Sequence, residues 1–152
     1  PQTETKMKKP FIILATLLIS VIAMQAENQR RIISFEELPK KAQTFVGSYF
    51  NALEITFVRM EVELTKTEYT VRFGNGMEVE FNSNGDWVEV ESHSECLPKD
   101  FLDEKILSFV DEHHKGYCFH EIARRRHKIE VELSSGLQLI FNKKGEFLRY
   151  ND

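Results

Sequence analysis

The sequence predicts an α+β protein of two tandem repeats, each a helix followed by four antiparallel strands, with both helices on one face of the sheet. One observation is a self-match at fixed spacing, because residues 76–90 (GMEVEFNSNGDWVEV) recur as residues 136–150 (GLQLIFNKKGEFLRY). A match of this kind is typical of repeated architecture. A second observation is a Leu-Pro pair ahead of the strands in each half, Leu38-Pro39 and Leu97-Pro98. The expected repeats span residues 35–93 and 96–152.

Residues 1–26 are expected to be an upstream extension and a secretory signal peptide. Lys8 and Lys9 precede an apolar run over residues 11–24, and Ala23 and Ala26 are candidate cleavage points. The run is shorter than the ~20 residues of a spanning helix, so we expect a periplasmic or secreted protein without a membrane span in the mature chain. Cleavage removes three lysines and one glutamate and so changes the net charge from −4 to −6. This acidic balance disfavours nucleic acid as a partner.

In the first repeat, residues 27–33 form a polar lead-in, and Ser34 with Glu37 has the spacing of a capping box for one helical turn. Leu38-Pro39 then opens a helix whose apolar residues keep helical spacing. From Ile55 apolar and polar residues alternate, which predicts antiparallel strands with one buried face. The loop over residues 74–76 predicts a hairpin that pairs Arg72 with Glu78.

The second repeat follows the same plan, with a longer helix from Leu97-Pro98 to Gly116. Strands are expected at residues 117–124, 128–133, 137–141 and 146–150. A three-residue loop over residues 134–136 would pair Leu133 with Leu137. Cys96 and Cys118 lie at the two ends of this helix, roughly 30 Å apart at 1.5 Å per residue. Two free thiols are therefore favoured over a disulfide, which would need the chain to double back.

Two turns compete at residues 82–85 and 142–145. A type I′ turn would pair Phe81 with Val88 and turn Trp87 to the open face of the sheet. A type I turn with a bulge would pair Phe81 with Trp87 on the helix side and leave Val88 and Val90 facing out. Asn at the first position and Gly at the fourth favour the second turn and a buried tryptophan. Both alternatives stay open, and in both of them apolar side chains of the last strand face away from the helix.

With its Leu-Pro helix openers, its strands ending in Phe-Asn-x-x-Gly and its export signal, the chain resembles the PepSY-like family over nearly all of residues 35–152. These are small periplasmic proteins of the Bacteroides group, similar in fold to the β-lactamase inhibitory protein. Many members carry Asp where this chain has Asn82 and Asn142. The resemblance implies a helix-backed antiparallel sheet whose open face binds a protein partner.

No pattern in the sequence indicates catalysis or a cofactor. A Gly-x-Ser-x-Gly elbow and a phosphate-binding loop are both missing from the sequence, so we expect a protein that is not an enzyme. Neighbouring His113 and His114 would point about 100° apart on a helix, and no HxxxH or CxxC spacing supports a metal site. The basic run at residues 124–128 is interpreted as a solvated turn that protects a sheet edge. The alternative is a contact for an acidic partner or a lipid headgroup.

The sequence therefore predicts an exported, non-catalytic module that binds an unknown protein of the cell envelope through the open sheet face. An inhibitor of a secreted or periplasmic hydrolase is the narrower form of this hypothesis. The alternative is a periplasmic carrier of a small ligand or metal that uses the histidines, which are His93, His113, His114, His120 and His127. The candidate partner-binding residues are Arg72, Glu78, Glu80, Trp87, Val88, Glu89, Val90, Ile140, Phe147 and Tyr150.

Overall fold

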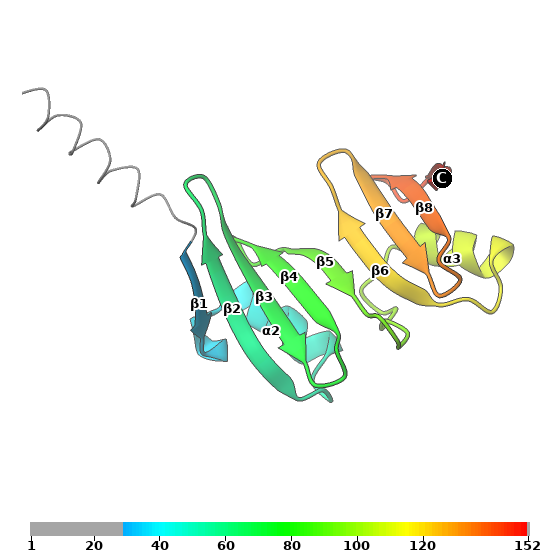
Figure 1. Cartoon of the computed structure of the whole chain (residues 1–152). Helices are drawn as coiled ribbons and strands as arrows, with labels where there is room; N and C mark the ends of the chain where they lie inside the picture. Colours follow the sequence, from blue (N-terminus) through cyan, green and yellow to red (C-terminus); the bar gives the residue numbers. More distant parts are fainter. Residues whose placement is uncertain (1–28, 152) are drawn as a thin grey trace, which may run out of the picture.

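The computed structural model describes residues 29–151 (Figure 1). The predicted signal peptide lies outside these residues. The elements in chain order are β1 (Gln29–Ile33), the short 3-10 helix η1 (Phe35–Glu37), α2 (Lys40–Tyr49), β2 (Ile55–Val62), β3 (Thr67–Phe73), β4 (Glu78–Asn82), β5 (Trp87–Glu91), α3 (Glu104–His113), β6 (Phe119–Arg124), β7 (Lys128–Leu133), β8 (Gln138–Asn142) and β9 (Phe147–Asn151).

All nine strands form one antiparallel sheet in the order of the sequence. The predicted division into two helix-plus-four-strand repeats is therefore wrong, although the α+β class holds. The two halves of the sheet join where Val90 of β5 lies opposite Ile122 of β6. Furthermore, residues 29–33 of the expected polar lead-in form strand β1, which pairs with β2 and places Arg30 against Glu61 at 2.8 Å. An edge strand tolerates such charged residues because one of its sides stays in water.

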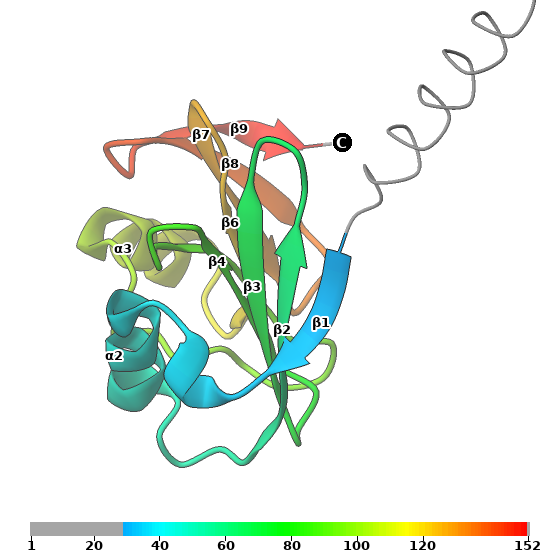
Figure 2. The same ribbon diagram turned by 90° about the vertical axis from the view of Figure 1, so that its left-hand side faces the viewer.

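Both helices pack against the same face of the sheet and leave the other face uncovered (Figures 1 and 2). Ala42 and Val46 of α2 and Ile106 and Val110 of α3 are buried in one core cluster with the strands beneath them. The predicted capping box before α2 is confirmed, since the Ser34 amide donates to Glu37 Oε2 at 2.8 Å.

The second helix is shorter than predicted. It begins at Glu104, after Asp103 accepts a hydrogen bond from the Lys105 amide at 2.9 Å. Leu97 does not open the helix, because its amide donates to the Phe119 carbonyl at 2.9 Å beside the start of β6. The Leu-Pro pair thus marks a helix start in one half of the chain only.

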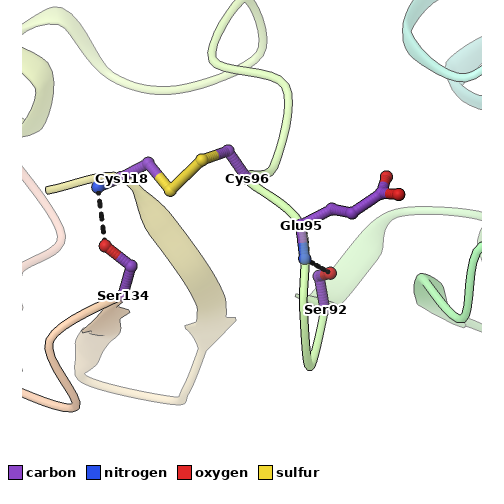
Figure 3. Close-up of a disulfide and its surroundings, with 5 residues drawn as sticks. All are labelled: Ser92, Glu95, Cys96, Cys118 and Ser134. Atoms are coloured by element: carbon purple, nitrogen blue, oxygen red, sulfur yellow. Dashed lines mark hydrogen bonds between the residues drawn. A yellow bond between two sulfur atoms is a disulfide. The ribbon is translucent and has the colours of Figure 1, made fainter.

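Because the chain doubles back here, Cys96 and Cys118 form a disulfide with Cα atoms 5.5 Å apart (Figure 3). The expectation of free thiols is wrong because it assumed that a helix fills the segment between the two cysteines. The helix covers only Glu104–His113, so the rest of the segment can fold back. Hydrogen bonds hold both sides of the bridge, from the Cys118 amide to Ser134 Oγ at 3.1 Å and from the Glu95 amide to Ser92 Oγ at 3.0 Å.

The hairpin loops follow the predicted three-residue registers. The Phe73 amide donates to the Met77 carbonyl at 2.9 Å, and Arg72 forms the expected ion pair with Glu78. In the second half the Leu133 amide donates to the Leu137 carbonyl at 3.0 Å.

The turn after β4 is the type I alternative. The Gly85 amide donates to the Asn82 carbonyl at 2.9 Å, and Phe81 pairs with Trp87, which is only 8% exposed. The register then shifts, so that Glu80 pairs with Glu89 and Val88 is the extra residue of a bulge. The bulge reverses the alternation, and Val90 is fully buried opposite Val79. The outward direction predicted for Val90 on this alternative is therefore wrong.

Candidate functional site

Two rows of mainly charged side chains cross the open face of the sheet. Each row consists of residues that lie directly opposite one another on successive strands. On the strands before β9, a neighbouring residue is buried in the core on the helix side. The first row is Arg59, Thr70, Glu80, Glu89, Ala123, Glu130, Ile140 and Arg149. The second row is Arg72, Glu78, Glu91, Glu121, Glu132, Gln138 and Asn151.

The structure divides the predicted site residues between the two faces. The first group lies on the open face and consists of Arg72, Glu78, Glu80, Glu89 and Ile140. The second group lies on the helix side and consists of Trp87, Val90, Phe147 and Tyr150. Tyr150 lies opposite the buried Leu139 at the sheet edge, and its hydroxyl contacts His114 Nε2 at 3.3 Å. Val88 lies at the bulge.

Basic residues neutralise part of the open face. Arg125 bridges two strands, with Nη1 2.8 Å from Glu89 and Nε 3.0 Å from Glu130. Lys128 Nζ also contacts Glu130 at 2.6 Å, and Arg72 pairs with Glu78. Two members of the predicted basic run thus form ion pairs within the chain.

Three half-buried glutamates on this face have no such partner. The side chains of Glu80, Glu91 and Glu121 form neither a hydrogen bond nor an ion pair with any residue of the described range 29–151. Burial raises the pKa of the Glu80 carboxyl, and the negative charge of Glu89 raises it further. The same two causes raise the pKa of Glu121. The centre of the open face therefore holds like charges close together, and the nearby Arg125 compensates them only in part.

Glu89, Glu91 and Glu121 each offer a carboxylate oxygen, and these oxygens lie within 4.8 Å of one another. Within residues 29–151 this is the only set of three donors placed closely enough for a metal ion. No histidine belongs to it. His113 instead contacts the Phe109 carbonyl through Nδ1 at 3.0 Å, and His114 faces Tyr150.

The predicted partner-binding residues did not include Glu91, Glu121 and Ala123, which lie on this face. Their alternation with Val90 and Ile122 marks them as polar-face positions, but only the pairing of β5 with β6 brings them together. Ala123 and Ile140 are buried at this face and lie outside the core cluster.

No helix of the described residues is long and apolar enough to cross a membrane.

Solved structures share the fold, among them three from Bacteroides species. One, described as a "putative periplasmic protein" of Bacteroides vulgatus, has a TM-score of 0.77 and 27% identity over 82% of this chain and 98% of its own. Another protein of that species, described as a "putative periplasmic protein of unknown function", has a TM-score of 0.76 and 28% identity, covering 82% of this chain and 100% of its own. The third, from Bacteroides thetaiotaomicron, is described as a "putative calcium-regulated periplasmic protein". It has a TM-score of 0.78 and 26% identity, covering 81% of this chain and 97% of its own.

No match was found among curated protein sequences. The predicted location is confirmed, since all three structural relatives are described as periplasmic. A protein-family model described as "Putative beta-lactamase-inhibitor-like, PepSY-like" matches residues 67–149, which is more than half of the sequence. The chain therefore belongs to the PepSY-like family.

Proposed function

We propose that this periplasmic protein is a non-catalytic binding module that engages another protein of the cell envelope through the open face of its sheet. The observation that carries the proposal is the set of unpartnered, half-buried glutamates, Glu80, Glu91 and Glu121, on a face that neither helix covers. The family's description as beta-lactamase-inhibitor-like supports the narrower form, inhibition of a periplasmic hydrolase.

Electrostatics explain why such a face favours a partner. Repulsion between Glu80 and Glu89 and between Glu121 and Glu89 costs free energy in the isolated protein. A protein that presents complementary charge removes this repulsion on binding and gains specificity from it. The ion pairs of Arg125 with Glu89 and Glu130 hold the neighbouring carboxylates in position.

Charge reversal on one face tests the proposal. The variant combines Glu80→Lys with Glu121→Lys, and the control combines Asp111→Lys with Glu112→Lys on the exposed end of α3. Each immobilised protein is incubated with periplasmic extract of the source bacterium, and a captured protein is purified and its affinity for each variant is measured. Weakened binding to the open-face variant alone supports the proposal. Equal affinity of both folded variants for the captured protein contradicts it.

Calcium binding is a second candidate function. Three carboxylate oxygens from Glu89, Glu91 and Glu121 lie within 4.8 Å of one another, and Ca²⁺ prefers oxygen ligands of this type. One structural relative is described as calcium-regulated. Isothermal titration with Ca²⁺ and Mg²⁺ tests the candidate on the wild type and on a Glu91→Gln/Glu121→Gln variant. A lack of heat from Ca²⁺ with the wild type would rule it out.

A further inference from the structure

A small cavity lies on the helix side of the sheet, away from the open face. Its volume is about 260 Å³. The lining residues come from α2, from the turn between β4 and β5, from the segment before α3 and from the end of β6, and they are Lys41, Phe45, Tyr49, Gly85, Asp86, Trp87, Phe101 and Arg124. This volume lies just below that of typical pockets for drug-sized ligands. The cavity therefore suits a single molecule smaller than those ligands.

Aromatic rings form the wall of this cavity. Phe45 stacks against Trp87 with ring centroids 6.0 Å apart, and Phe101 meets Trp87 edge-on at 5.3 Å. Tyr49 completes the group at 5.5 Å from Phe101. Such a wall favours a planar apolar group, because aromatic rings pair with a further ring at similar distances.

Arg124 covers the aromatic wall from the end of β6. Its guanidinium carbon lies 3.6 Å from the centroid of the Trp87 ring. The strand alternation explains this position, since Ala123 and Arg124 point to opposite faces. Within the described part of the chain, the Arg124 side chain has no ion pair or hydrogen bond. Burial lowers the pKa of Arg124 and the charge of Asp86 opposes this, but an arginine stays protonated at neutral pH.

The remaining charges of the cavity leave this guanidinium available. Asp86 is the one carboxylate among the lining residues, and Lys41 already forms an ion pair with it. With two cations and one anion, the lining has a net charge of +1. The Tyr49 hydroxyl also has no hydrogen-bond partner among residues 29–151. The cavity therefore holds one more cation than it has carboxylates, together with the phenol hydroxyl of Tyr49.

We propose that this cavity binds a small aromatic carboxylate, with the carboxylate on Arg124 and the ring against Phe101 and Tyr49, beside the Trp87 ring that Arg124 covers. The planar guanidinium fork donates two parallel hydrogen bonds to a carboxylate. The site is independent of the open sheet face, because its residues lie on the helix side of the sheet.

Trp87 is the single tryptophan of the sequence and therefore reports directly on the cavity. The probe is phenylacetate, titrated at constant ionic strength while Trp87 fluorescence and the indole N–H signal in a ¹H–¹⁵N spectrum are followed. Phenylacetamide replaces the carboxylate by a neutral amide, and acetate lacks the ring. We expect saturable binding of phenylacetate. Phenylacetamide should bind at least about tenfold more weakly because it loses the charge-assisted hydrogen bonds to Arg124, and acetate should bind more weakly because it loses the contact with the aromatic wall.

Arg124→Gln removes the charge, and Arg126→Gln is the matched control from the same hairpin. Arg126 has no ion pair or hydrogen bond with any described residue. We expect Arg124→Gln to weaken phenylacetate binding at least about tenfold and Arg126→Gln to leave it unchanged, with circular dichroism confirming that both variants fold. The proposal is overturned by no saturable binding to the wild type, by equal affinity for phenylacetamide, or by unchanged affinity in folded Arg124→Gln. An Arg124→Gln protein that does not fold is replaced by Arg124→Lys, which keeps the charge but loses the fork and must also weaken binding.

Discussion

The disulfide between Cys96 and Cys118 joins the segment that leaves β5 to the residue just before β6. Their Cα atoms are 5.5 Å apart, and the neighbouring Leu97 amide donates to the Phe119 carbonyl at 2.9 Å. The bridge thus closes a loop that contains α3, and it does so beside the pairing of β5 with β6 that makes the sheet continuous.

Removing this bridge is expected to destabilise the fold. The two cysteines are 22 residues apart in sequence. Closing a loop of that length lowers the conformational entropy of the unfolded chain and so raises its free energy by about 3 kcal/mol. We expect a Cys96→Ser/Cys118→Ser variant to lose about that much free energy of unfolding in urea. The matched control is dithiothreitol, which should lower the stability of the wild type and leave the variant unchanged. A variant as stable as the oxidised wild type would contradict the prediction.

Gly85 is expected to be intolerant of a side chain. Its φ is +79°, and an added Cβ would lie 2.8 Å from the Pro39 Cβ and 3.0 Å from the Ala42 amide nitrogen. We expect Gly85→Ala to lower the free energy of unfolding by about 1–3 kcal/mol, because strain and close contact act together.

Gly47 provides the matched control for this substitution. It lies within α2, and no atom is within 4 Å of an added Cβ. Gly47→Ala is therefore expected to stabilise the protein by up to about 1 kcal/mol. Chemical denaturation of both variants checks the opposite signs, and destabilisation of equal size at the two positions would contradict the argument.

Local patterns predicted those parts of the fold that local chemistry determines. The loops before Met77 and Leu137 and the turn at Asn82 follow from glycine positions and from cross-strand pairs. Strand β1 was missed because residues 29–33 (QRRII) lack alternation and are stabilised by pairing with β2. The Glu89, Glu91 and Glu121 cluster was missed because it depends on the pairing of β5 with β6.

The bulge at Val88 predicts unequal costs for two neighbouring valines. Val90 is fully buried between Val79 and Ile122, whereas Val88 is half-buried and pairs with no residue of β4. We expect Val90→Ala to cost about 2 kcal/mol of unfolding free energy and Val88→Ala less than about 1 kcal/mol. Urea denaturation measures both. The reverse order would mean that the alternation is not interrupted at this turn.

Because of Glu80 and Glu121 on the open face, we expect the free energy of unfolding to decrease as pH rises. The folded-state pKa of Glu80 and of Glu121 is raised by burial and by repulsion from Glu89. Between the ordinary glutamate pKa and these raised values the folded protein binds more protons than the unfolded chain, so its free energy of unfolding decreases with increasing pH. The destabilisation is fully present above the raised pKa values and is lost as pH falls through them. We therefore expect Glu80→Gln/Glu121→Gln to increase the free energy of unfolding at pH 7. The variant should also show a flatter pH dependence of this free energy above the ordinary glutamate pKa.

Glu130 supplies the control with the opposite sign. A hydrogen bond from Lys128, joined by one from Arg125, holds the pKa of this carboxyl below its usual range. Its contribution to stability is present above the ordinary glutamate pKa and is lost as pH falls through the lowered value. Glu130→Gln should therefore reduce stability at pH 7, whereas Glu80→Gln/Glu121→Gln increases it. Urea denaturation between pH 4 and pH 8 measures both variants, and a loss of stability in both at pH 7 would show that the unpartnered glutamates carry no repulsive cost.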